Sequence, residues 1–192
     1  AVSPTVGHRA WHTIGYQRHQ DVDYPALPMD LVSTDGWIYD GGYRVHVDDP
    51  VLHASEVRIA LASLDHVMDN AHKSNRPLLE ARSESEVLAL GARGAFEWGL
   101  GPVRLDSGAD LSFVRRDGVR ARLLPASGQR FRDHLWPDAR QWDLGLFTEA
   151  RVEPRDRLAF RVGGRLDHVQ SSLGGARDPS LGGLSVRDQF LR

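Results

Sequence analysis

The chain has 192 residues and a formal net charge of −2, with 24 Lys and Arg side chains against 26 Asp and Glu side chains. This near-balance gives no electrostatic reason to expect nucleic acid as a partner, and the absence of Cys excludes disulfides, zinc–thiolate sites and thiol nucleophiles. No apolar run of about 18 residues occurs, which excludes a membrane-spanning helix. A spanning β-barrel stays open, because its apolar residues alternate with polar ones.

Seven segments alternate apolar and polar residues with a period of two, the pattern of β-strands that have one apolar and one polar face. In chain order they are residues 9–20, 33–47, 56–68, 85–98, 103–116, 141–152 and 157–170. The alternation is least regular in the first segment and clearest in 103–116, where Leu105 and Leu111 alternate with Asp110. No segment has a convincing helical period. We therefore predict an all-β fold, an antiparallel up-and-down sheet.

Short and long connections alternate between these segments. The short ones are residues 48–54, 99–102 and 153–156, and the long, polar ones are 21–32, 69–82 and 117–140. Alternate connections of an up-and-down sheet lie at opposite ends, so one end carries turns and the other carries loops, as in outer-membrane barrels. A soluble antiparallel sheet or sandwich also alternates. The segments, however, exceed the usual length of about 5 or 6 residues in soluble sheets, which favours a partial transmembrane β-barrel.

Four stretches resemble motifs of TonB-dependent outer-membrane receptors. They are DVDYPALPMD at 21–30, LDHVMDN at 64–70, LWPDARQWDLGLFTE at 135–149, and RVGGRLDH at 161–168, which is similar to the family's G-x-R-x-D strand. They occur in the expected order, and within the family the chain looks most like the copper receptors.

The resemblance implies a 22-stranded barrel that is filled by an N-terminal plug and driven through a TonB box. Seven strands are about a third of such a barrel, so we expect residues 1–192, which begin at Ala1, to be a piece of the barrel from which the plug is absent. Residues 171–192 are interpreted as a further external loop. The implied function is active uptake of a metal ion or metal chelate, copper or iron–siderophore, in the bacterial outer membrane. The implied partners are this substrate, outer-membrane lipid, and the TonB complex through the missing plug region.

The candidate metal ligands are His66, Met68, His72 and Met29. His66 and Met68 are two positions apart and so point to the same face of a strand, and imidazole with thioether suits copper better than a hard cation. The alternative interpretation is that they are ordinary rim and loop residues, because no spacing here fixes a site.

Two further sets of residues follow from the strand faces. On the polar faces, the residues expected to face the lumen are Arg58, Arg93, Arg104, Asp106, Asp110, Arg161, Arg165 and Asp167. They contact the plug or form cross-strand ion pairs along a solvated wall. On the apolar faces, the residues expected to form an aromatic girdle at the lipid interface are Trp37, Tyr39, Tyr43, Trp98 and Trp142; in a soluble sheet they would be core aromatics.

The sequence contains no G-x-S-x-G, H-E-x-x-H or P-loop motif. We therefore expect a protein that is not an enzyme and that needs no cofactor. Two alternatives to the receptor fragment remain. One is a small eight-stranded outer-membrane barrel with a structural or pore role, in which the first and last strands must pair. The other is a soluble β-domain that binds a ligand on its loops.

Overall fold

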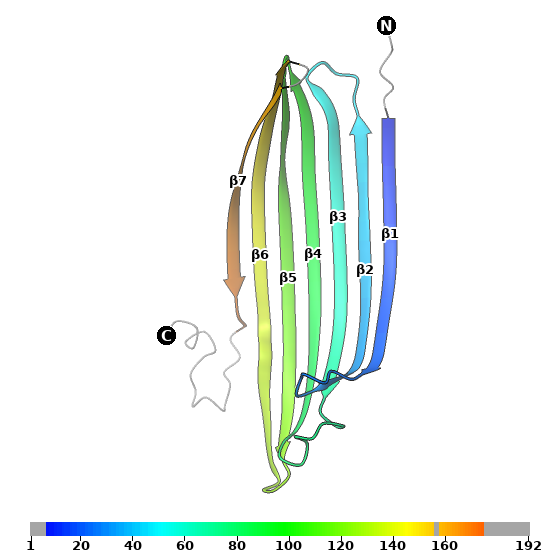
Figure 1. Ribbon diagram of the computed structural model, residues 1–192, viewed down its shortest axis with the longest axis vertical. Helices are drawn as coiled ribbons and strands as arrows, with labels where there is room; N and C mark the ends of the chain where they lie inside the picture. The colour runs from blue at the N-terminus through cyan, green and yellow to red at the C-terminus, as the bar shows by residue number, and fades with distance from the viewer. Residues whose placement is uncertain (1–6, 156–157, 175–192) are drawn as a thin grey trace.

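The computed structural model describes residues 7–155 and 158–174. These residues form a single antiparallel sheet of seven strands, each paired with its neighbours in the chain. The strands are β1 (Gly7–Val22), β2 (Asp30–His46), β3 (Leu52–Asp69), β4 (Glu80–Leu100), β5 (Val103–Leu124), β6 (Gln129–Arg155) and β7 (Leu158–Ser172). Figure 1 shows one layer of strands with β1 and β7 at its edges. The predicted all-β, up-and-down topology is confirmed.

The connections divide the sheet into two different ends (Figure 1). At the turn end, β2 and β3 are joined through Val47–Val51, where the carboxylate of Asp49 accepts hydrogen bonds from the backbone N–H groups of Val51 and Leu52 at 2.8 and 2.9 Å. Gly101, with a φ of 64°, turns the chain between β4 and β5. At the loop end lie residues 23–29 and 70–79 and the tip of the β5–β6 hairpin.

The expected long loop at residues 117–140 is wrong. β5 continues to Leu124 and β6 already begins at Gln129, so a turn of four residues joins them. Gly128, with a φ of 69°, donates its N–H to the carbonyl of Leu124 at 2.8 Å and closes this turn. Residues 119–123 alternate apolar and charged side chains, but this run is short and polar residues flank it, whereas backbone pairing continues along the whole hairpin.

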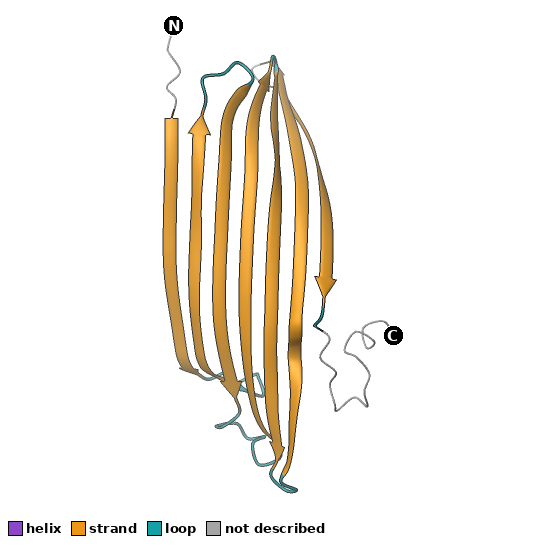
Figure 2. Cartoon of the chain, turned by 180° about the vertical axis from the view of Figure 1, so that it is seen from behind, coloured by secondary structure: helices purple, strands orange, loops and turns teal. Residues whose placement is uncertain are grey.

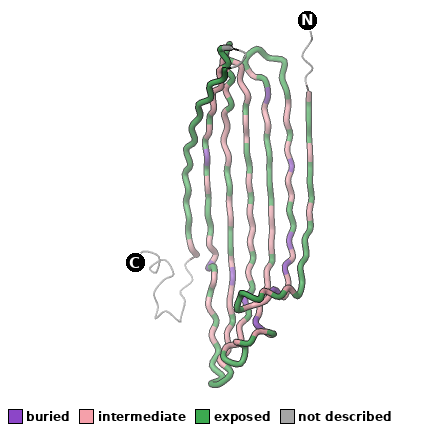
Figure 3. The backbone as a smooth tube through the Cα atoms, viewed as in Figure 1, coloured by how far each residue is buried: buried purple, intermediate pink, exposed green. Residues whose placement is uncertain are grey.

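The sheet has almost no core. The paired residues place one apolar stripe on one side, hereafter the apolar face, and most of the charged side chains on the other, the polar face. Within the described residues the buried hydrophobic side chains are only Leu31 and Ala54, whereas Trp37 is 59% and Val162 72% exposed. Figures 2 and 3 show the single layer of strands and its sparse burial. A soluble sandwich would cover its apolar face with a second layer, and the described residues supply none.

The edges of the sheet bear on the eight-stranded alternative. β1 pairs with β2 and β7 pairs with β6, and within the described residues the two edge strands do not pair with each other. The predicted external loop at 171–192 falls mostly on residues outside the described ranges. No helix in the described part of the chain is long and apolar enough to cross a membrane.

Candidate functional site: the polar face and the loop end

The strand register places all eight residues predicted to face the lumen on the polar face. Arg58 is directly opposite Arg93, which is opposite Asp110, and the remaining members follow the same alternation on β5 and β7. Ion pairs join Arg58 to Asp40 at 2.8 Å and Arg93 to Asp110 at 3.9 Å. These side chains are partly exposed, so each pair contributes only a fraction of a kcal/mol. The face is a solvated ladder of charges rather than a buried network.

One contact on this face spans three strands. Arg165 on β7 reaches across β6 and donates two hydrogen bonds, each of 2.7 Å, to the carboxylate of Asp110 on β5. It passes over Gly145, where a Cβ would lie 2.1 Å from Arg165 Nη2 and 2.8 Å from an Asp110 oxygen. Arg165 also pairs with Asp167 at 2.6 Å. A glycine in the middle strand is what allows this bidentate bridge.

The five predicted interface aromatics all lie on the apolar face. Trp37 packs against Tyr16 with a centroid distance of 4.7 Å, and Trp142 packs against Phe113 at 4.3 Å. Near the turn end, Trp98 donates from Nε1 to Ser107 Oγ at 2.8 Å. The placement of Tyr39 and Tyr43 follows from the same register, opposite Leu61 and Val57 respectively.

The apolar stripe ends abruptly toward the loop end. Two positions beyond Trp37 stands Asp35, and the register aligns Asp35 with Asp65, Glu86 and Asp117 on the next three strands. On β5 the apolar face runs from Val103 to Phe113, a span of eleven residues that Ser107 interrupts. A tilted strand needs about 9–11 residues to cross the hydrocarbon layer. The stripe therefore has the length of a spanning segment, and the rest of β2–β6 extends beyond it.

The predicted metal ligands are distributed over the loop end. His66 and Met68 lie on the polar face of β3 as expected, and His66 Nδ1 contacts Thr34 Oγ1 at 2.7 Å. Burial lowers the pKa of His66, which favours the neutral imidazole. Met29 and His72 lie in the two neighbouring loops, and His72 is exposed. In the part of the chain that the structure describes, no three His, Asp or Glu side chains are grouped to hold a metal ion.

The sole lysine of the chain ties these two loops together. Lys73 Nζ lies 2.8 Å from a carboxylate oxygen of Asp23, 2.6 Å from one of Asp30, and donates to the carbonyl of Tyr24 at 2.9 Å. The ammonium lowers the pKa of Asp30, and the two carboxylates raise the pKa of Lys73. Asp23, Asp30 and Lys73 line a pocket of about 550 Å³ between the loops.

A buried asparagine shapes the second loop. Asn70 is 2% exposed. Its amide nitrogen donates to Asn75 Oδ1 at 3.0 Å and to the carbonyl of Leu79 at 2.6 Å, and its Oδ1 accepts from the N–H of Ala81 at 2.8 Å. A side chain at the start of residues 70–79 thus satisfies backbone groups at the end of the loop and fixes the loop against β4.

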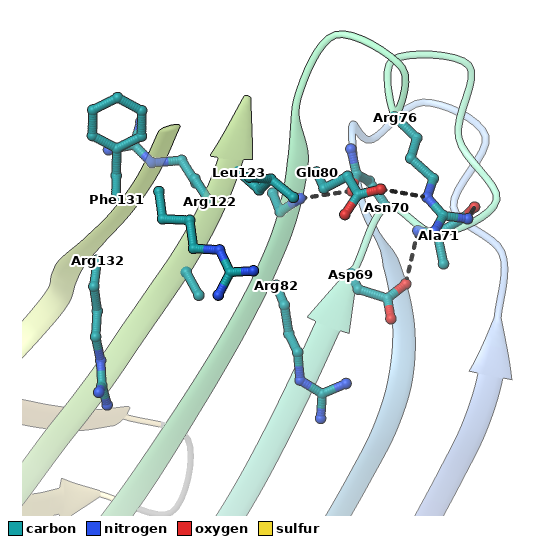
Figure 4. A pocket seen from close by; sticks show the side chains of 13 residues that line it. Asp69, Asn70, Ala71, Arg76, Glu80, Arg82, Arg122, Leu123, Phe131 and Arg132 are labelled. Carbon is teal, nitrogen blue, oxygen red and sulfur yellow. Dashed lines mark hydrogen bonds and ion pairs between the residues drawn. The ribbon is translucent and has the colours of Figure 1, made fainter. Parts of the chain in front are cut away.

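A second pocket of about 550 Å³ lies beside this loop. Figure 4 shows it between residues 69–80 and the extended parts of β4, β5 and β6. Its arginines are Arg76, Arg82, Arg122, Arg130 and Arg132. Sequence reasoning missed this cluster because it treated residues 69–82 and 117–140 as separate loops. The extended hairpin brings them to the same end of the sheet, with Arg82, Arg130 and Arg132 on one face and Arg122 on the other.

Comparison with known proteins gives matches to solved structures. No family model and no curated protein matches the sequence. Among solved structures, the chain is similar to the copper transporter OprC, with a TM-score of 0.67 and 18% identity, over 79% of this chain and 25% of that one. The chain therefore spans about a quarter of the length of that protein. The likeness confirms the predicted fold, consecutive long antiparallel strands of one sheet that match part of a TonB-dependent receptor barrel.

Proposed function

We propose that this chain is part of the wall of a bacterial outer-membrane TonB-dependent receptor that actively takes up a metal ion or metal chelate. The observation that carries the proposal is the uncovered apolar face. It is long enough to span a membrane on β5, it bears aromatic side chains near both of its ends, and it stops at a row of carboxylates. Lipid covers such a face without a second protein layer.

The polar face suits the inside of such a barrel. Its arginines pair with carboxylates on nearby strands, which supports a water-filled wall and leaves charged groups available to a plug. The bridge from Arg165 to Asp110 holds β5, β6 and β7 in register on that side. We infer that the receptor contacts the TonB complex through a plug region, and that this chain supplies wall strands and external loops.

Copper and iron–siderophore are the two substrate classes we propose to test. For copper, His66 and Met68 on one face, with Met29 and His72 in the adjoining loops, offer imidazole and thioether donors. Because Nδ1 of His66 contacts Thr34, Nε2 is the ring nitrogen left to bind a metal ion.

The test is metal uptake by cells that carry or lack the gene for this chain. We expect the chain in the outer-membrane fraction, and we expect deletion to reduce accumulation of either copper or an iron chelate, with the same loss in cells that lack TonB. A double variant, His66→Ala with Met68→Ala, separates the two substrates, since it should reduce copper uptake alone. His12→Ala with His168→Ala, which alters histidines away from this site, is the matched control. Unchanged uptake together with a chain found in the soluble fraction would overturn the proposal.

A further inference from the structure

Beyond the apolar stripe, the side of the sheet that continues the apolar face changes its charge from strand to strand. On β2 and β3 this side carries no basic side chain, and its carboxylates include those of Asp35, Asp65 and Asp69. Because side chains alternate along a strand, the same side of β5 and β6 carries two carboxylates, Asp117 and Asp138, and four arginines. These arginines, hereafter the outer arginine patch, are Arg115, Arg130, Arg132 and Arg140.

Two members of the patch lie directly beyond the apolar stripe. Arg115 is opposite Arg140, and the apolar pair before them is Phe113 and Trp142, whose ring centroids are 4.3 Å apart. The two guanidinium groups share one carboxylate, that of Asp138, at 2.6 and 2.5 Å. This contact leaves one of the two positive charges uncompensated.

The depth of this inner pair matches the phosphates of a membrane lipid. Arg115 is two positions beyond Phe113, which places it about 7 Å farther along the strand. The headgroup layer of a bilayer adds about 5–7 Å on each side of the hydrocarbon core. Under the proposed function, Arg115 and Arg140 therefore lie at the level of the lipid phosphates.

The other two members lie much farther from the stripe. Arg132 is opposite Ala121 and Arg130 is opposite Leu123, and neither arginine has an ion-pair partner within residues 7–155 and 158–174. Ala121 is eight positions beyond Phe113, about 26 Å along the strand and, at a tilt of about 45°, about 18 Å in height. A phosphate at this height needs a headgroup larger than that of an ordinary phospholipid.

Apolar side chains return between these arginines. Beyond Asp117, the side of β5 that continues the apolar face carries Val119, Ala121 and Leu123. Arg132 and Arg130 border this strip on β6, and Arg82, which pairs with Glu84 at 2.9 Å, borders it on β4. A headgroup built from sugar rings would place its C–H faces on the strip and its oxyanions on the arginines.

We propose that the outer arginine patch binds a glycolipid whose sugar headgroup carries phosphate groups at two depths. The inference rests on the proposed function, which sets this side of the sheet against lipid. Arg115 and Arg140 bind a phosphate near the acyl chains, and Arg130 and Arg132 bind one farther out. Planar guanidinium groups hold phosphates through paired hydrogen bonds. The carboxylates over β2 and β3 repel the same phosphates, which confines the glycolipid to β5 and β6.

The experiment is native mass spectrometry of the full chain in detergent micelles. Three lipids are titrated: lipopolysaccharide with phosphorylated core sugars, the same material after chemical dephosphorylation, and phosphatidylglycerol. The variant Arg130→Gln with Arg132→Gln breaks no ion pair of the described residues and should weaken binding of the phosphorylated glycolipid by about tenfold. It should leave the affinity for phosphatidylglycerol unchanged, because the phosphate of that lipid does not reach the outer pair.

Two further variants complete the test. Arg115→Gln with Arg140→Gln should weaken binding of both phosphorylated lipids, with tryptophan fluorescence as the check that the sheet has formed. Arg9→Gln with Arg116→Gln is the matched control, since it removes two positive charges from the polar face and should leave each affinity within about twofold.

Four results would overturn the proposal. They are equal affinity for the phosphorylated and dephosphorylated glycolipid, an unchanged affinity of the Arg130 and Arg132 variant, equal losses in the matched control, and binding of free pyrophosphate as tight as that of the glycolipid. These affinities are measured without uptake. A chain that resides in the outer membrane and transports its metal but binds no glycolipid therefore refutes this inference alone, whereas a chain found in the soluble fraction refutes the proposed function.

Discussion

The half of the sheet near the turn end and the half near the loop end differ in how their side chains are arranged. From the turn end to the row of Asp35, Asp65 and Glu86, each strand alternates apolar and polar side chains and the apolar face lies uncovered. Beyond that row the same strands continue with polar groups on both faces, and side chains from the loops pack against them. In the first half the alternation of apolar and polar side chains follows the two faces of the sheet. In the second half the arrangement depends on contacts between particular side chains.

This difference decides which substitutions are costly. In the half between the turn end and this row, hereafter the spanning half, the proposed function expects a side chain to matter chiefly for the face on which it lies, because the opposite faces would meet lipid and water. In the loop half a side chain matters for the particular backbone groups and charges that it contacts. The predictions below test this contrast, beginning with the largest expected effect.

Ile59→Arg should strongly destabilise the chain in lipid vesicles, while Ala60→Arg should not. Ile59 lies between Val57 and Leu61 on the apolar face and is 50% exposed, whereas the adjacent Ala60 lies on the polar face. Arginine near the centre of the hydrocarbon layer costs about 2–4 kcal/mol, and a position facing water costs far less. Urea unfolding followed by tryptophan fluorescence measures both. Equal effects of the two variants would mean that the two faces meet the same environment.

Asn70→Ala should loosen residues 70–79 without affecting the spanning half. The variant leaves the N–H of Ala81 and the carbonyl of Leu79 without their partner, at a cost of about 1–3 kcal/mol. Hydrogen exchange should accelerate in the loop and at the start of β4, and stay unchanged around Ile59. Ser74→Ala, at an exposed position of the same loop, is the control. Faster exchange throughout the sheet would show that the two halves unfold as one unit.

The strands of the spanning half were predicted well from the sequence, because a sheet with one apolar and one polar face requires side chains that alternate with a period of two. All seven strands were expected from that pattern, and the register confirms that the eight charged residues share one face, with Arg58 and Asp110 among them. The five aromatics were likewise assigned to the correct face of their strands.

The loop half was predicted less well, for a physical reason. Residues 117–140 were interpreted as a loop because their alternation is confined to short runs such as 119–123, yet backbone hydrogen bonds and arginine–aspartate pairs hold them in two strands. The arginine pocket depends on this hairpin, since Arg82 and Arg132 are 50 positions apart in the sequence. The Arg165 bridge was missed because it depends on the missing side chain of a glycine in the intervening strand.

Gly145→Ala tests that bridge, with an expected effect of about 1 kcal/mol or less, because the displaced group is the mobile end of an exposed arginine. The new Cβ would lie 2.1 Å from Arg165 Nη2 and would push the guanidinium away from Asp110. Gly164→Ala, whose Cβ would meet nothing within 4 Å, is the matched control. Hydrogen exchange along β7 should increase only in the first variant. The same change in both would mean that glycine flexibility, not the bridge, sets the stability of this edge.

Acid should release the two loops from each other before it affects the spanning half. The pKa of Asp30 is lowered from its ordinary value of 3.8, chiefly by its hydrogen bond to Lys73. A lowered pKa means that the contact contributes its full stability above pH 3.8 and loses it as the pH falls through the value in the folded chain. Exchange at Leu27 and Lys73, corrected for the intrinsic pH dependence, should therefore rise below about pH 4. Asp30→Asn should remove most of this pH dependence, whereas Asp23→Asn should remove less, because Asp23 is 76% exposed and Asp30 only 13%. If both variants kept the dependence of the unaltered chain, another group would be responsible for the acid response.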